Sequence, residues 1–231
     1  MTAVDYVPFV ERMIHRYEGG YGWDAGDSGG PTCWGITCYD LAEFEHQKMN
    51  SMAAWASRVR AMPISVADQI YRTKYATQCC FDQLGPGKDC VVFDFGVNSG
   101  SSRAIKYAQT VVGAHCDGLL GPATLEAING HDPRDFVTRL CAVRLRFLKG
   151  LGIWSRFGRG WAARVADLRG YSLNLIPKQA ALMGARIKKE KPTKTGHSKE
   201  LRIPRAFGKG YHPDDLKQIK ELHESPGRSA A

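Results

Sequence analysis

Three carboxylates stand close together in a glycine-rich stretch near the start of this 231-residue chain. Glu18 comes directly before Gly19-Gly20, and Asp24 and Asp27 follow it within nine residues. A carboxylic acid can donate a proton to a leaving group while a second carboxylate stabilises positive charge or activates water. Glycines permit the tight turns that would carry Asp27 back toward Glu18. We therefore expect a proton-transfer site, with Glu18 as the acid and Asp27, or alternatively Asp24, as the second carboxylate.

The segment before Glu18 is predicted to be an amphipathic helix. Val10, Ile14 and Tyr17 recur at intervals of three and four residues, and Gly19-Gly20 is a strong helix stop. Glu18 would thus sit at the C-terminal end, where the helix dipole disfavours a further anion by about 0.3–1 kcal/mol. This position favours the protonated form that a general acid needs. The plainer alternative is a polar surface loop that follows an ordinary helix.

The motif in this stretch runs Glu18-Gly-Gly-Tyr21, then Asp27-Ser-Gly-Gly-Pro-Thr32, then Trp34-Gly-Ile-Thr37. It resembles the N-terminal motif of the glycoside hydrolase family 108 lysozymes, which are N-acetylmuramidases. The resemblance implies that Glu18 is the catalytic acid. The order Glu18, Asp27, Thr32 is also similar to the Glu, Asp, Thr arrangement of phage-type lysozymes, with one residue fewer before the threonine. Thr37 is therefore a rival to Thr32.

A second resemblance lies further along the chain. Asp94 and Asn98 are four residues apart in an apolar background, so they share one face if that segment is helical. Together with Asp117-Gly-Leu-Leu-Gly-Pro-Ala-Thr124 they resemble the peptidoglycan-binding region that accompanies family 108 catalytic domains. The two polar residues either brace the fold or face a polar ligand. The resemblance covers roughly residues 6–172.

The domain boundaries are predicted from turn-forming residues and composition. Leu84-Gly-Pro-Gly-Lys88 separates two helical halves, and the sequence after Pro177 is rich in charge and poor in apolar residues. We expect a catalytic lobe over 1–88, a peptidoglycan-binding-like helical lobe over 89–176, and a basic C-terminal tail over 177–231. The expected fold is mostly α-helical, lysozyme-like and two-lobed, with at most a small β hairpin between residues 21 and 37.

The resemblance implies hydrolysis of the β-1,4 bond between N-acetylmuramic acid and N-acetylglucosamine in peptidoglycan. Glu18 would protonate the glycosidic oxygen, Asp27 would stabilise the transition state or activate water, and Thr32 would position that water. No metal and no cofactor are expected. The side chains expected to bind substrate are those of Tyr21, Trp34, Tyr75, Asp94 and Asn98.

The positive charge of the chain is concentrated at one end. Residues 178–231 hold 13 lysines and arginines against 6 acidic residues, an excess of seven within a net charge of +9. This pattern is typical of an appended basic segment rather than a folded nucleic-acid-binding face. Anionic wall polymers or a membrane surface are possible partners. The seven cysteines are scattered and lack a paired metal-binding spacing, so we expect buried free thiols.

The expected setting follows from the N-terminus and the hydropathy. We see no signal peptide and no apolar run near 18 residues, so synthesis in the cytoplasm and action on the cell wall in the periplasm are expected. Export would then need a holin, as for a phage endolysin, or secretion machinery. Two alternatives stay open: a lytic transglycosylase that uses Glu18 alone, and a wall-binding protein without catalysis.

Overall fold

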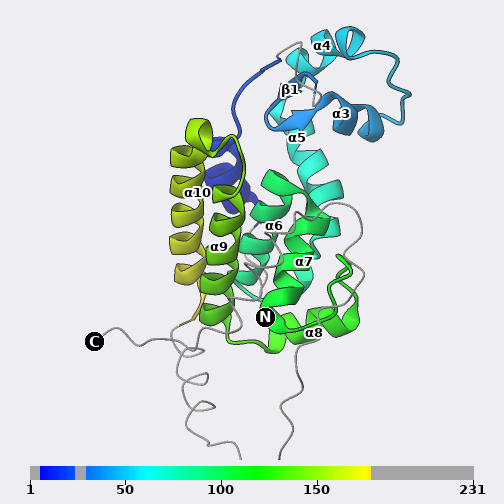
Figure 1. The fold of residues 1–231 in the computed structure, drawn as a ribbon. Helices are drawn as coiled ribbons and strands as arrows, with labels where there is room; N and C mark the ends of the chain where they lie inside the picture. Colours follow the sequence, from blue (N-terminus) through cyan, green and yellow to red (C-terminus); the bar gives the residue numbers. More distant parts are fainter. Residues whose placement is uncertain (1–5, 24–29, 178–231) are drawn as a thin grey trace, which may run out of the picture.

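The computed structural model describes residues 6–23 and 30–177. Within these ranges it is almost entirely helical, with one two-stranded hairpin (Figure 1). This confirms the expected lysozyme-like helical fold with a small hairpin. The elements, in chain order, are α1 (Tyr6–Phe9), η1 (Val10–Ile14), α2 (His15–Tyr17), β1 (Thr32–Cys33), β2 (Ile36–Thr37), α3 (Cys38–Phe44), α4 (Met52–Ala61), α5 (Ile64–Ile70), η2 (Tyr71–Ala76), η3 (Phe81–Gln83), α6 (Lys88–Ser99), α7 (Ser101–Val112), α8 (Pro122–Gly130), α9 (Pro133–Lys149) and α10 (Trp154–Leu175).

The helices form two bodies in space. The helical lobe consists of the N-terminal run α1–α2 together with α6–α10, which pack side by side (Figure 1). The hairpin lobe consists of the hairpin, α3 and α4, with α5 leading away from it toward the helical lobe. The chain crosses between the two lobes directly after Glu18.

The N-terminal helical run belongs to the helical lobe because its apolar face packs there. The ring of Phe9 lies 5.9 Å from the ring of Phe93 on α6 and 5.6 Å from that of Tyr171 on α10. Residues from both sides of the expected boundary at residue 88 thus share one core. The division into 1–88 and 89–176 stays a prediction about sequence modules, and the basic tail lies outside the described residues.

The hairpin is closed by a two-residue turn. Thr32 pairs with Thr37 and Cys33 with Ile36, which leaves Trp34 and Gly35 at the turn. Both turn residues have positive φ, 53° and 73°, as a type I′ turn requires. This turn points back toward the end of α2.

Local capping sets several of the helix ends. Thr37 and Asp40 form a capping box at the start of α3. Lys88, which is buried at the start of α6, donates from Nζ to the carbonyls of Ile128, Asn129 and His131 at the end of α8. The side chain of Lys88 therefore ties the start of α6 to the end of α8.

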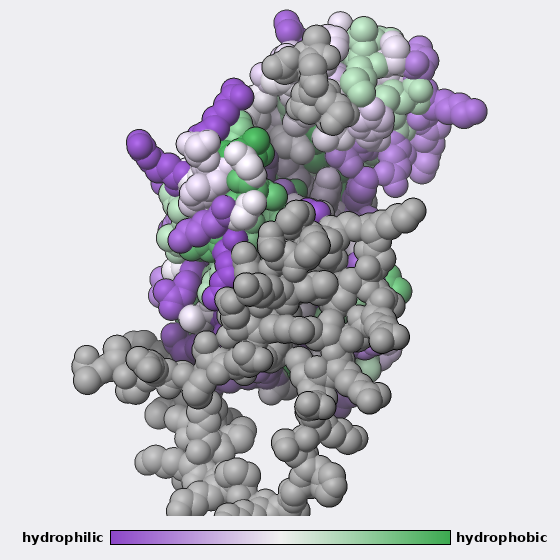
Figure 2. Space-filling model, in the orientation of Figure 1, coloured by the Kyte–Doolittle hydropathy of each residue, from purple (hydrophilic) through white to green (hydrophobic). Residues whose placement is uncertain are grey.

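The surface is polar over much of the view in Figure 2, with hydrophobic residues near the tops of α9 and α10. Ile153 and Phe157 are exposed there. Of the described residues, no helix combines the length and the hydropathy needed to cross a membrane. All seven cysteines are free, and five of them are buried.

Candidate active site

Glu18 stands at the junction of the two lobes. It is the residue that ends α2, where its backbone turns from helical to extended (φ −91°, ψ 116°), so the predicted helix end is confirmed. Its side chain is 19 % exposed. The carboxylate therefore lies at the edge of the core and within reach of solvent.

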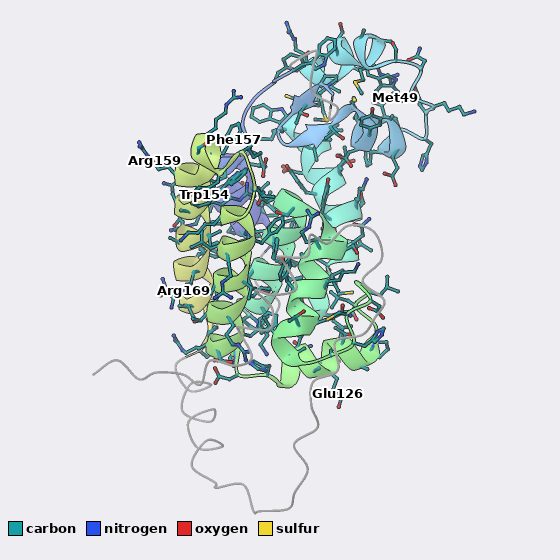
Figure 3. The ribbon with its side chains drawn as sticks, viewed as in Figure 1. Met49, Glu126, Trp154, Phe157, Arg159 and Arg169 are labelled. Atoms are coloured by element: carbon teal, nitrogen blue, oxygen red, sulfur yellow. The ribbon has the colours of Figure 1, made fainter. Side chains whose placement is uncertain are left out.

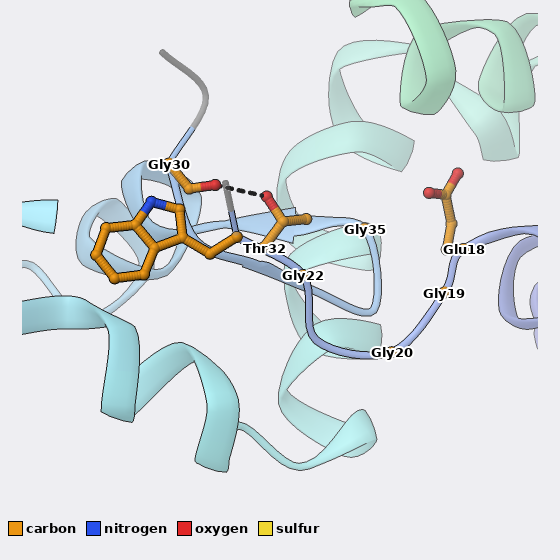
Figure 4. Close-up of a pocket in the computed structure, with 8 residues that line it drawn as sticks. Glu18, Gly19, Gly20, Gly22, Gly30, Thr32 and Gly35 are labelled. Carbon is orange, nitrogen blue, oxygen red and sulfur yellow. Dashed lines mark hydrogen bonds between the residues drawn. The ribbon is translucent and has the colours of Figure 1, made fainter. Parts of the chain in front are cut away.

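A pocket of about 410 Å³ opens beside Glu18 (Figure 4). Its wall is largely backbone, because five of its lining residues are glycines and no side chains narrow it there. Trp23, which is 40 % exposed, supplies an aromatic face. The lining residues are Glu18, Gly19, Gly20, Gly22, Trp23, Gly30, Thr32 and Gly35.

The hairpin turn packs directly on the carboxylate. A Cβ atom on Gly35 would lie 2.7 Å from Oε2 of Glu18 and 2.4 Å from the hydroxyl oxygen of Tyr71. Tyr71 donates a hydrogen bond of 2.6 Å to the carbonyl of Trp34. Burial and the nearby Glu18 carboxylate raise the pKa of Tyr71 far above its usual value, so its hydroxyl keeps its proton. Tyr71 thereby fastens the turn against Glu18.

Arg164 on α10 is the cation that meets Glu18. Its Nη1 donates to Oε1 of Glu18 at 2.5 Å. Its Nη2 and Nε donate to Oδ1 of Asp94 on α6 at 2.8 and 3.1 Å. A positively charged guanidinium thus lies directly against the proposed acid.

Asp94 does not face a ligand, which corrects the expectation that it binds substrate. It is fully buried and pairs with Arg164 and with Arg144, whose Nη1 lies 2.6 Å from Oδ2. Burial alone would raise the pKa of Asp94, but the two arginines outweigh it and hold the pKa below its usual value. Asp94 and Asn98 both lie on α6, four residues apart, as predicted. Of the two, Asp94 braces the fold through its ion pairs with Arg144 and Arg164.

The other predicted substrate-binding side chains have partners outside the described pocket lining. The ring of Tyr21 is covered by the guanidinium of Arg60 at 4.3 Å. The indole nitrogen of Trp34 donates to the carbonyl of Met62. Tyr75 donates to Asp40 at 3.4 Å, and Asn98 accepts from Ser99 at 3.1 Å. None of these four appears among the described residues that line the pocket.

The two threonines have different surroundings. Thr32 lines the pocket, and its hydroxyl donates to the carbonyl of Gly30 at 3.3 Å. Thr37 caps α3 and donates its hydroxyl to Asp40 at 2.8 Å. Thr37 is thus committed to a structural role, which leaves Thr32 as the better candidate. Asp24 and Asp27 lie outside the described residues.

Sequence reasoning missed Trp23 and the two arginines of the site, Arg144 and Arg164. Trp23 carried a usable signal, since a tryptophan beside glycines is poorly placed for a core. The arginines carried none, because each looked like an ordinary helix residue. Among the described residues, no group of three or more His, Cys, Asp or Glu side chains is arranged to hold a metal ion.

Comparison with known proteins decides the family. Residues 12–100 match the family described as Glycosyl hydrolase 108. The solved structure of Brucella abortus SagA is similar at 36 % sequence identity and a TM-score of 0.65, covering 73 % of this chain and 95 % of that one. The chain belongs to glycosyl hydrolase family 108. It is therefore a glycoside hydrolase of the lysozyme type. No protein with a curated function matches the sequence.

The pocket lies within the part of the chain that matches the family. The matched residues 12–100 contain Glu18 and all of the pocket lining, whereas Arg144 and Arg164 lie beyond them. The similarity to SagA extends over most of the described chain. The carboxylate at the pocket is thus part of the hydrolase segment, and its cation comes from the helices that follow.

Proposed function

We propose that this protein is an N-acetylmuramidase. It hydrolyses the β-1,4 bond between N-acetylmuramic acid and N-acetylglucosamine in peptidoglycan, and Glu18 protonates the departing glycosidic oxygen. The observation that carries the proposal is a partly exposed carboxylate at a glycine-walled pocket in a family 108 chain. A pocket lined by backbone and one exposed tryptophan suits a bulky polar sugar chain. The family supports peptidoglycan as the substrate.

Arg164 would stabilise the Glu18 carboxylate that is left after the proton has been transferred. Once Glu18 has given its proton to the sugar oxygen, it carries a negative charge. Arg164 already stands at hydrogen-bond distance from that charge. An interaction that strengthens as charge develops lowers the barrier more than it stabilises the ground state.

Asp27 is the proposed second carboxylate and Thr32 the proposed water-positioning residue. Thr32 lines the same pocket as Glu18, and Figure 4 shows it near the middle of the view, to the left of Glu18. Retaining enzymes hold the two carboxyl groups about 5–5.5 Å apart and inverting ones about 6.5–9.5 Å apart. Trapping the anomer of the first product by NMR would distinguish the two outcomes.

A lytic transglycosylase is the competing enzyme, because it needs only the acid. Glu18 at the pocket suits the role of the acid in either reaction. Mass spectrometry of the muropeptides released by the wild-type protein decides between them. Hydrolysis adds one water to each cut, whereas transglycosylation closes an anhydro ring and adds none. Anhydro products alone would overturn the muramidase proposal.

The setting is proposed on the chemistry of the substrate. Peptidoglycan lies outside the cytoplasmic membrane, so we propose that the protein works in the periplasm and reaches it with a holin or secretion machinery. Expression in a bacterium with an inducible holin tests the lytic role. We expect lysis only after the holin is induced; lysis without it would point to another route.

A further inference from the structure

Four charged side chains form a continuous series from the core to the pocket. Arg144 on α9 contacts Asp94 on α6, Asp94 contacts Arg164 on α10, and Arg164 contacts Glu18 at the end of α2. Side-chain exposure rises along the series, from 2 % and 0 % to 5 % and 19 %. Residues far apart in sequence thus meet in one line that ends at the proposed acid.

The charges of this series balance. Two carboxylates face two guanidinium groups, and three of the four are almost fully buried. Ions in such a place are tolerated only when each has a close partner, and removing one leaves a neighbour uncompensated. The charge on any one member therefore affects every other member.

Asp94 fixes the direction in which Arg164 points. It accepts from both Nε and Nη2 of Arg164, and the guanidinium plane is rigid. The remaining Nη1 is thereby directed to Glu18. The orientation of the cation at the pocket is set by a carboxylate that never reaches the pocket.

Arg144 is held for its charge more than for its hydrogen bonds. Its Nη1 serves Asp94, but its buried Nε and Nη2 have no hydrogen-bond partner among the described residues. Its guanidinium lies over the ring of Phe95 at 5.3 Å. Two buried orphan donors cost free energy, so a neutral residue would suit a purely structural role better.

The other groups around the series keep their charge state near neutral pH. Burial raises the pKa of Tyr71 and Tyr75 on η2, and it raises the pKa of Cys141 on α9 to about 12. Asp40 on α3 is paired with Lys74 at 2.7 Å. Burial and the hydrogen bond to Asp167 raise the pKa of Tyr17, whose ring lies 5.6 Å from the guanidinium of Arg164.

We propose that Asp94 and Arg144 are positioning residues that set, through Arg164, the pH range over which Glu18 keeps its proton. The inference rests on the proposed role of Glu18 as the acid. Asp94 limits the positive charge that Glu18 experiences, and Arg144 prevents Asp94 from drawing Arg164 away. The two residues act on the reaction without touching the glycan.

The direction in which each substitution shifts the pH profile of activity distinguishes this role from simple support of the fold. Arg164→Met removes the cation, so Glu18 should hold its proton to higher pH. The alkaline limb of the activity profile should then move up by about one pH unit or more. Asp94→Asn leaves Glu18 as the one carboxylate of the series beside two cations, so the limb should move down. Arg144→Met should move it up by less than Arg164→Met does.

The experiment follows the proton of Glu18 and the reaction separately. The carboxyl carbon of Glu18 is titrated by ¹³C NMR in the wild type and each variant, and peptidoglycan cleavage is recorded over the same pH range. Asp89→Asn, another buried carboxylate on α6, and Arg169→Met, an exposed residue of α10, are the matched controls. We expect opposite shifts for Arg164→Met and Asp94→Asn, and a titration close to wild type in the controls.

The double variant Asp94→Asn/Arg144→Met restores the balance of one cation and one carboxylate. Its titration should return toward that of the wild type, and it covers the case in which Asp94→Asn alone does not fold. Shifts in the same direction for both single variants, or no shift while activity falls, would overturn the proposal. If the wild type cleaves no peptidoglycan, the proposed function fails, yet the NMR titration still decides the coupling.

Discussion

At the scale of single residues, the pocket depends on the lack of a side chain at Gly35 as well as on the carboxylate of Glu18. Gly35 stands at a positive φ of 73°, in contact distance of both Glu18 and Tyr71. A side chain at this position would be strained by its backbone and would also displace the proposed acid. Gly35 is therefore constrained both by its backbone conformation and by the space beside Glu18.

We predict that Gly35→Ala loses most of its activity and is destabilised by about 1–3 kcal/mol. The added methyl group must push away either the Glu18 carboxylate or the Tyr71 hydroxyl. Gly130→Ala is the control, because nothing lies within 4 Å of its Cβ position and it is helical. Chemical denaturation and peptidoglycan turnover are measured for both. Wild-type activity in Gly35→Ala would show that the turn does not constrain Glu18.

At the scale of elements, one buried carboxylate joins three long helices. Asp94 on α6 meets Arg144 on α9 and Arg164 on α10. Because these arginines hold the pKa of Asp94 below its usual value, the stabilisation is present above the unfolded-state pKa of about 3.9. It is lost as pH falls through the lower value of the folded state.

We predict that thermal stability falls between about pH 4 and pH 2 more steeply in the wild type than in Asp94→Asn. Asparagine leaves Arg144 without a charged partner and Arg164 with Glu18 alone, so the variant should be clearly less stable near neutral pH. The difference should shrink as acid protonates Asp94 in the wild type. Melting temperatures of the wild type and of Asp94→Asn, measured across this pH range, check the prediction. A difference that is constant with pH would mean that Asp94 does not act through its charge.

Sequence reasoning reached the local features of the site. Glu18 at a helix end and the small hairpin both depend on near neighbours in the chain, whose preferences are readable. It placed Asp94 and Asn98 on one helical face, but the face turned toward the core. Whether a helix face points to the core or to solvent depends on the elements that pack against it. The spacing of residues along α6 does not contain this information.

The partners of Glu18 could not be predicted in the same way. Arg164 is 146 residues from Glu18, and Asp94 is 70 residues from Arg164. Such pairs exist only because α2, α6 and α10 pack together. An arginine in a helix is usually solvated, so its residue type alone does not indicate a buried carboxylate partner.

At the scale of the whole molecule, the acid lies where the chain passes from the helical lobe to the hairpin lobe. Figure 3 shows exposed charged side chains such as Arg159, Arg169 and Glu126 on the outer surface of the helical lobe. The described residues 6–23 and 30–177 contain the pocket and its charged support. The excess charge of the chain, in contrast, belongs to residues 178–231.

We predict that deleting residues 178–231 leaves turnover of soluble glycan fragments unchanged and weakens binding to whole cell walls at low salt. The deleted stretch carries an excess of seven positive charges, and such attraction is screened as salt rises. Cosedimentation with purified walls at several salt concentrations measures it. Equal binding by both forms at low salt would show that the stretch does not contribute.

The central claim is that Glu18 delivers the proton. Release of soluble fragments from purified peptidoglycan by Glu18→Gln tests it, with Glu126→Gln, an exposed residue of α8, as the matched control. We expect Glu18→Gln to keep its circular dichroism spectrum and lose nearly all activity, while Glu126→Gln behaves as the wild type. Robust release of fragments by a folded Glu18→Gln variant would contradict the account.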